Sequence, residues 1–304
     1  VTAASVSGMV QRLDGSIMTE IPEHWYKLYT NGTKFRMMLS EIPLPGYNHI
    51  DKFYISTYEA CISRSEGKLW SENLYAYSDG NSSLNNLRGG DNTSDWDGTY
   101  RSLLKRPVTN LTRDQFRQAA RKRGSGWEMY TYGAHKILFW LFAVEYATLN
   151  SQKAFNANLT AEGYHQGGLG EGVTTGAVKV NGADTWSFVP CGTTNSLGNG
   201  TGIIEYTHTN TNAEGASTGT KVVNVPRYRG IENPFGHVWK NVIDVVVAGT
   251  DNSVYICKDY TKFGTFEGGT NPTAEQLIAA GYELQDFKES TTTSQYVKKL
   301  VNNN

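Results

Sequence analysis

Hydrophobic and polar residues alternate like those of a β-strand near the start of the chain. The alternation covers residues 25–29, and a second run with strand character follows at residues 35–39. Between them stands the pair Asn31-Gly32, a strong signal for a tight hairpin turn because both residues tolerate positive φ. The pattern therefore predicts a β-hairpin.

A further strand is expected over residues 51–60, ending in Glu59. A buried Glu needs hydrogen-bonding partners. Arg229 or backbone amides are the expected partners.

The spacing changes to a helical period in two later segments. Thr112 and Gln115 have the spacing of a capping box, and the segment 112–123 places apolar residues on one face before Gly124 ends it. A second, more hydrophobic helix is expected from about Tyr132 to Asn150. A small third helix is predicted to begin at Asn271-Pro272, with the Asn as its cap, and to end at Gly281.

Polar segments separate these elements. Residues 1–20 are weakly patterned and are interpreted as an N-terminal arm or linker, which leaves 21–304 as one domain. Two long loop insertions are expected within it, at about 64–105 and 154–220. Short strands are predicted at 186–188, 203–208 and 254–257.

The stretch 227–244 is the part of the chain around which we expect the rest to pack. It passes from an arginine-rich segment through the turn Asn233-Pro234 into a hydrophobic run that predicts a buried strand. Trp239 is large enough to anchor a core. The expected structural residues are Glu59, Arg229, Asn233, Gly236 and Trp239.

This stretch resembles the motif N-x-x-G-N-V-W-E-W-x-x-D of the C-type-lectin-like fold found in formylglycine-generating enzymes. Asn233, Gly236, Trp239 and Asp244 match the motif, and His237 stands where the family has Asn. The strand at 51–60 is similar to the family segment F-x-I-G-x-Y-E-V-T. The same superfamily includes the variable proteins of diversity-generating retroelements and phage tropism determinants, which the chain resembles more.

The resemblance implies an α+β fold: a C-type-lectin-like domain with two helices, a small and mostly antiparallel sheet, and long structured loops. The family usually closes with a segment like G-G-S-W followed by G-F-R, and neither motif is present in this sequence. The reactive cysteines of formylglycine-generating enzymes belong to that segment. The resemblance therefore favours a binding protein over an enzyme.

The composition also favours a binding protein. The 304 residues carry a net charge of −1, with 28 basic and 29 acidic residues, 18 Tyr and 32 Gly. A nearly neutral chain argues against a nucleic-acid partner, which needs a basic surface. No apolar run approaches the roughly 20 residues that span a bilayer, so no membrane insertion is expected. Abundant Tyr, Asn and Gly are typical of binding loops on extracellular or virion proteins.

The sequence contains few residue patterns that indicate catalysis or metal binding. Cys61, Cys191 and Cys257 are far apart and are expected as buried free thiols, with one disulfide plus a free thiol as the alternative. The six His residues show no zinc spacing, and His237 is interpreted as a satisfied core or turn residue. No cofactor is expected, although loop oxygens in residues 91–97 leave weak calcium binding open.

Aromatic residues in polar loops are the candidate ligand contacts, because aromatic faces stack on sugars and fill interface pockets. They are Trp70, Trp96, Tyr164 and Trp186. The favoured hypothesis is a non-enzymatic phage or prophage virion protein, of a tail or head fibre, located on the virion surface or outside the cell. Its partners would be a host-cell surface glycan or protein, other virion subunits and further copies in a homo-oligomer such as a trimer. The alternatives are a bacterial surface adhesin, a purely structural virion subunit and, least favoured, a formylglycine-generating-type enzyme.

Overall fold

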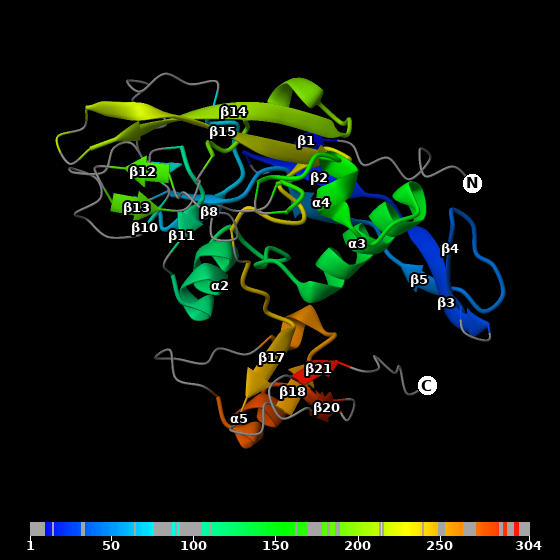
Figure 1. Cartoon of the computed structure of the whole chain (residues 1–304). Helices are drawn as coiled ribbons and strands as arrows, with labels where there is room; N and C mark the ends of the chain where they lie inside the picture. Colours follow the sequence, from blue (N-terminus) through cyan, green and yellow to red (C-terminus); the bar gives the residue numbers. More distant parts are fainter. Residues whose placement is uncertain are drawn as a thin grey trace. The chain divides into compact units, whose positions relative to one another are not determined.

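The computed structural model describes most of the chain between residues 10 and 297. The described residues are 10–13, 15–31, 34–63, 65–75, 87–88, 90–91, 105–109, 111–161, 163–168, 178–180, 183–185, 189–212, 214, 216–238, 240–248, 253–263, 272–285, 288–290 and 295–297. Within them the fold class is α+β, as the sequence predicts, with helices and several small, mostly antiparallel sheets (Figure 1).

The chain divides into two compact units. Unit 1 comprises residues 1–110 and 135–239, and unit 2 comprises residues 111–134 and 240–304. The sequence analysis treats 21–304 as one domain. The structure instead groups the helix expected at 112–123 with the C-terminal part, because this helix bonds to Phe263 through Arg117, whose Nη1 lies 2.8 Å from the Phe263 carbonyl oxygen.

The first sheet of unit 1 corrects the expectation of an N-terminal arm. Strand β2 (Ser16–Ile21) lies in the middle of this sheet, between β1 (Val10–Leu13) and β6 (Phe53–Ser56), and is antiparallel to both. Its side chains at Ser16, Met18, Thr19 and Ile21 are buried. The segment reads as polar from the sequence because its core positions include Ser and Thr, which bond internally here: Thr19 Oγ1 lies 2.8 Å from Thr57 Oγ1.

The predicted hairpin is confirmed. Strand β3 (His24–Asn31) pairs antiparallel with β4 (Lys34–Ser40), from Trp25↔Ser40 to Asn31↔Lys34, so that two residues link the strands. On its other edge β3 pairs with β5 (Asn48–Ile50). These three strands extend to one side of unit 1 (Figure 1).

Small sheets lie within the first expected insertion. Strand β7 (Cys61–Ser63) pairs with β8 (Lys68–Trp70) and with β9 (Leu87–Arg88). The short strands β10 (Gly90–Asp91) and β11 (Val108–Thr109) are parallel. The insertion at 64–105 is therefore attached at both ends to ordered strands.

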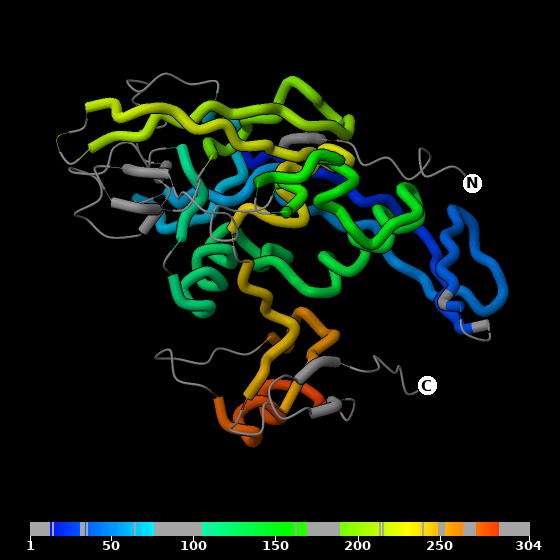
Figure 2. The backbone as a smooth tube through the Cα atoms, viewed as in Figure 1, coloured from blue at the N-terminus to red at the C-terminus, as the bar shows by residue number. Residues whose placement is uncertain are grey.

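A long hairpin occupies the second expected insertion. Strand β14 (Gly202–Thr211) pairs antiparallel with β15 (Ser217–Tyr228), which then pairs with β16 (Ile231–Glu232). The two long strands run side by side in Figure 2. The sequence pattern predicts only part of β14 and does not predict β15, whose first four residues are exposed Ser, Thr and Gly and so give no alternating pattern. A separate hairpin joins β12 (Val178–Val180) and β13 (Ala183–Thr185).

The predicted hydrophobic helix is α3 (Tyr132–Tyr146), followed by α4 (Ser151–Phe155) and, further on, the 3-10 helix η4 (Asn195–Leu197). Phe142 is fully buried and lies within 6.1 Å of the ring centres of Tyr146, Phe155, Tyr228 and Phe235. Aromatic rings bury large areas and favour tilted and edge-to-face packing. This cluster joins α3 to the end of β15 inside unit 1.

Unit 2 contains α2 (Arg113–Arg121), which has the predicted capping box at Thr112 and Gln115. Its other elements are β17 (Val245–Ala248), β18 (Ser253–Ile256), η5 (Tyr260–Lys262), α5 (Ala274–Ala279), β19 (Glu283–Gln285), β20 (Lys288–Ser290) and β21 (Gln295–Val297). Strands β17, β18 and β19 form one antiparallel sheet, and β20 pairs with β21. The cap of α5 is Thr273, in a capping box with Gln276, and not Asn271 as predicted.

Only the last part of the expected central strand, at 245–247, forms a strand, and the part before it contains turns. After β16 the chain turns through residues 233–238 and becomes a strand again only at Val245. Asn233 and His237 both have positive φ, which is incompatible with an extended strand. Trp239 lies outside the described residues. No described helix is long and apolar enough to cross a bilayer.

Candidate functional site

A buried acid and imidazole pair lies at the centre of unit 1. His237 Nδ1 donates a hydrogen bond to Glu59 Oε2, and both side chains are less than one tenth exposed. Glu59 follows β6 in the chain, and His237 belongs to the turn after β16. The predicted need of Glu59 for a buried partner is therefore met by His237, which was not among the expected partners, Arg229 or backbone amides.

The second ring nitrogen of His237, Nε2, also has a partner within the protein. Val189 N donates to His237 Nε2 over 3.2 Å, so Nε2 carries a lone pair and Nδ1 carries the hydrogen. Both ring nitrogens of His237 are thus in contact with groups of the protein itself. The contact fits the interpretation of His237 as a satisfied core residue.

A small cavity lies beside this pair. It measures about 10 Å³, room for about one water molecule, and is lined by Gly168, Val189, Val223, Asn224, Val225, Asn233 and His237. The Gly168 carbonyl oxygen accepts a bond of 2.8 Å from His237 N. A Cβ at Gly168 would lie 2.4 Å from Pro226 Cγ, so only glycine permits this approach. Gly168 thus allows close packing in unit 1.

Glu232 forms a second buried polar centre. Its Oε1 accepts a bond from Gly192 N at 2.9 Å, and its Oε2 accepts bonds from the backbone N and the hydroxyl of Thr194, each at 2.7 Å. Burial raises the pKa of the Glu232 carboxyl, and the bonds from Thr194 and Gly192 oppose the rise. Glycine is required at 192, where φ is +95° and a Cβ would lie 2.1 Å from Asn73 Oδ1.

Arg227 extends this network through Thr194. It is fully buried, its Nη1 donates to Thr194 Oγ1 at 3.1 Å, and its Nε donates to the Gly198 carbonyl at 2.7 Å. Its guanidinium also lies over the ring of Tyr58, 5.4 Å from the centroid. The hydroxyl of Thr194 connects the buried cation to the buried carboxylate of Glu232, an arrangement that fixes the loop at residues 192–198 on the β15–β16 hairpin.

Arg229 bonds elsewhere in unit 1. Its Nε lies 3.0 Å from Glu145 Oε2 and 3.0 Å from the Tyr228 hydroxyl, which donates to the same Glu145 oxygen at 2.8 Å. Burial raises the pKa of the Tyr228 hydroxyl, so it stays a donor over the physiological range. The contact attaches the C-terminal half of α3 to the turn after β15.

The three cysteines are buried and free. Cys191 Sγ donates to the Glu59 carbonyl at 3.1 Å, and burial raises the pKa of its thiol well above the usual value. Burial likewise raises the pKa of Cys257, as its apolar context predicts. A raised pKa suppresses the thiolate, which is the nucleophilic form. Free thiols were the expectation, and the disulfide alternative is not realised.

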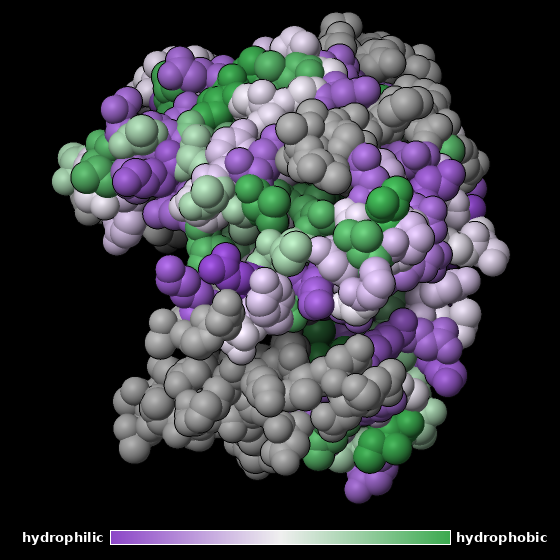
Figure 3. Space-filling model, turned by 90° about the vertical axis from the view of Figure 1, so that its right-hand side faces the viewer, coloured by the Kyte–Doolittle hydropathy of each residue, from purple (hydrophilic) through white to green (hydrophobic). Residues whose placement is uncertain are grey.

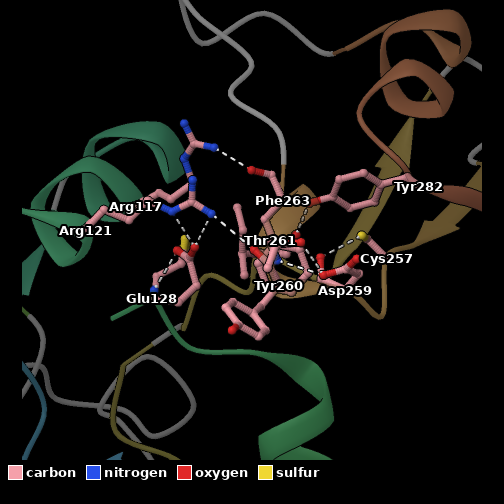
Figure 4. A network of polar contacts seen from close by, with 11 residues as sticks. Arg117, Arg121, Glu128, Cys257, Asp259, Tyr260, Thr261, Phe263 and Tyr282 are labelled. Carbon is pink, nitrogen blue, oxygen red and sulfur yellow. Dashed lines mark hydrogen bonds and ion pairs between the residues drawn. The ribbon is translucent and has the colours of Figure 1, made fainter. Parts of the chain in front are cut away.

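Unit 2 has its own polar network (Figure 4). Arg121 forms an ion pair with Glu128 at 2.7 Å and also donates to the Tyr260 carbonyl at 3.3 Å. Arg117 donates to the Phe263 carbonyl, and Tyr282 donates to the Ile243 carbonyl. These contacts join α2, η5 and the β17–β18–β19 sheet. The basic side chains of Arg117 and Arg121 on α2 therefore make contacts within the fold.

Of the four candidate ligand residues, the structure describes Trp70 and Tyr164. Tyr164 is 44% exposed. Trp70 packs against Cys61 and Leu74, and so belongs to a core cluster. Trp96 and Trp186 lie outside the described residues, as do the calcium candidates at 92–97; the side chain of Asp91 is likewise not described. The structure brings none of the described candidates together into one pocket.

The structural residues are better grouped. Glu59, Asn233 and His237 meet, since Asn233 Nδ2 lies 3.3 Å from His237 Nδ1. Gly236 lies in the same turn. The sequence analysis missed roles for Glu232, Arg227 and Glu145. Glu232 carried a usable signal, because a single carboxylate beside Ile231 in a turn-flanked apolar segment needs internal donors if it is buried.

Comparison with protein-family models, with curated proteins and with solved structures found no match to this chain.

Proposed function

We propose that this chain is a non-enzymatic attachment or decoration protein of a phage or prophage virion, with a C-type-lectin-like domain that presents ligand-binding loops on a rigid framework. The lectin-like assignment and the virion setting rest on the resemblance in residues 51–60 and 233–244. The described geometry supports the framework part. Its buried Glu, His and Arg side chains are used to fix turns to strands.

The observation that carries the proposal is an exposed apolar segment whose described residues are hydrogen-bonded to one another. Leu159 is 62% and Tyr164 is 44% exposed, and residues 159 and 165 are joined by a β-bridge. Thr160 N donates to the Tyr164 carbonyl at 2.7 Å, and Tyr164 N donates to Thr160 Oγ1 at 3.2 Å. A preordered turn that holds Tyr in solvent supplies contact area at low entropic cost.

A second apolar group supports the same role. The β3–β4 hairpin and the loop after it expose Tyr29, Met38, Ile42 and Leu44, each by 38% or more. Figure 3 shows the face that lies on the right in Figure 1, the side of this hairpin. On that face, small hydrophobic groups lie among hydrophilic residues. Such mixed surfaces are typical of non-obligate contacts with a partner.

The test measures binding of the fluorescently labelled full chain to whole bacterial cells and to a glycan array. Replacing Tyr164 by Ala should lower binding by about tenfold or more, as expected for an aromatic anchor worth 1.4 kcal/mol or above. The control is Tyr260→Ala, a tyrosine of unit 2 that is 61% exposed, which should bind like the wild type.

If the wild type binds virion subunits but neither cells nor glycans, the purely structural alternative replaces this proposal. Equal binding by Tyr164→Ala and the wild type would show that the turn is not part of the binding surface.

Thiol labelling of the native chain tests the alternative that the protein is a formylglycine-generating-type enzyme. Rapid labelling of Cys257 would favour that alternative, whereas burial predicts none.

A further inference from the structure

Three metal-ligating side chains meet at one end of the β3–β5 pair. Strands β3 and β5 are antiparallel, with His24 opposite Ile50 and Trp25 opposite His49. Continuing this register by one residue sets Glu23, just before β3, opposite Asp51, just after β5. Antiparallel pairing thus brings both carboxylates to the end of the sheet that carries His49.

The distances show how closely they meet. Glu23 Oε1 lies 2.6 Å from His49 Nε2, and Asp51 Oδ1 lies 3.8 Å from His49 Nδ1. One ligand atom from each of the three side chains lies within 4.8 Å of the others. Glu23 approaches ring nitrogen Nε2 and Asp51 approaches Nδ1. An ion bound to one of these nitrogens would sit about 2.0–2.2 Å from each ligand atom, so the carboxylate at the other nitrogen has to rotate toward it to complete the site.

The imidazole is held in place while its edges remain accessible. The rings of Trp25 and His49 are stacked, with centroids 5.0 Å apart and planes 23° apart. The side chains of His49, Glu23 and Asp51 are 43%, 54% and 93% exposed. An ion can therefore enter with its remaining water ligands, and the stacked ring loses little freedom when it binds.

We propose that Glu23, His49 and Asp51 form a binding site for a divalent transition-metal ion, with Zn²⁺ as the representative ion. One imidazole nitrogen and two carboxylate oxygens form a mixed ligand set that suits zinc better than the all-oxygen sets preferred by calcium and magnesium. Three protein ligands leave the remaining positions to water. The two carboxylate groups favour a cation at this position.

Without an ion, the same distances fit an ion-paired arrangement of His49 with Glu23 and Asp51. The test separates this ion-paired arrangement from a metal site. The full chain is titrated with ZnCl₂ at pH 7.5 by isothermal calorimetry, and again at pH 5.5. We expect one Zn²⁺ per chain, with at least about tenfold weaker binding at pH 5.5, because protons compete for the imidazole and carboxylates.

Variants assign the site to its residues. His49→Ala and Asp51→Asn should each weaken Zn²⁺ binding by about tenfold or more, as loss of a ligand or of its supporting partner does. His165→Ala is the control, since His165 bonds to the Asn158 carbonyl and belongs to no such group among the described residues. Asp51 is the most exposed of the three, so Asp51→Asn keeps the test informative if His49→Ala disturbs the strand pair. Absence of Zn²⁺ binding by the wild type, or wild-type affinity in Asp51→Asn, would overturn the proposal and leave the ion-paired arrangement.

Discussion

His24 illustrates how a single buried residue makes stability depend on pH. It is 1% exposed, and its Nδ1 lies 2.8 Å from the Pro22 carbonyl oxygen, to which it donates. Burial lowers the pKa of His24 from its usual 6.5, an effect that the Pro22 bond opposes and that nearby His49 reinforces. The folded chain therefore holds His24 neutral at a pH where the unfolded chain already binds a proton.

The sign of the effect follows from proton linkage. Stability from neutral His24 is complete above pH 6.5 and declines as the pH falls through 6.5 toward the folded pKa, because only the unfolded state takes up the proton. We expect the melting temperature of the wild type to fall over this range. In His24→Gln the fall should be smaller, as measured by thermal melts at several pH values, with His165→Gln as the control. Parallel pH profiles for wild type and His24→Gln would contradict this account.

At the scale of elements, the start of α3 depends on a residue far away in sequence. Asp244 Oδ1 accepts from Tyr132 N at 2.6 Å, and Asp244 Oδ2 accepts from Gly133 N at 2.8 Å. The first N–H groups of a helix lack internal partners, and the helix dipole favours a negative charge at this end. The Asp of the resemblance motif thus acts as a cap for α3.

Removing this cap should destabilise the chain. Asp244→Ala removes the acceptors of two amide groups at the start of the helix and should lower the free energy of unfolding by about 2 kcal/mol. Asp244→Asn retains one acceptor oxygen and should lose about half as much. Urea denaturation followed by circular dichroism measures both. An Ala variant as stable as the wild type would show that water replaces the cap without cost.

Local signals in the sequence predict several elements well. The Asn31-Gly32 pair, the capping box at Thr112 and the period of α3 each depend on near neighbours, and all three elements form as expected. Strand β15 and the turns at 233–238 were not predictable in this way. Their conformation depends on partners distant in sequence, such as β14 for the strand and Glu59 for His237.

At the scale of the whole molecule, each of the two units has a core of its own. Leu141 and Phe142 are fully buried in unit 1, and Leu277 and Ile243 are fully buried in unit 2. Separate cores allow units to open separately, because local unfolding follows cooperative groups of contacts.

Paired core substitutions test this independence. Leu277→Ala should cost about 2–5 kcal/mol and should speed amide hydrogen exchange mainly in residues 111–134 and 240–304. Leu141→Ala should do the same in unit 1. Hydrogen exchange measured by mass spectrometry distinguishes the two patterns. Equal acceleration in both units by either variant would show that they unfold as one.

The sequence by itself determined the hairpin, helix α2 with its capping box, the hydrophobic helix α3, the α+β class and the need of Glu59 for a buried partner, because each depends on short-range spacing or on the cost of burying a charge. Only the tertiary structure decided which partner Glu59 takes, that Glu232 and Arg227 share Thr194, and that Glu23, His49 and Asp51 meet. Those contacts arise from strand pairing and from turns that join residues far apart in the chain, and no local pattern encodes that pairing.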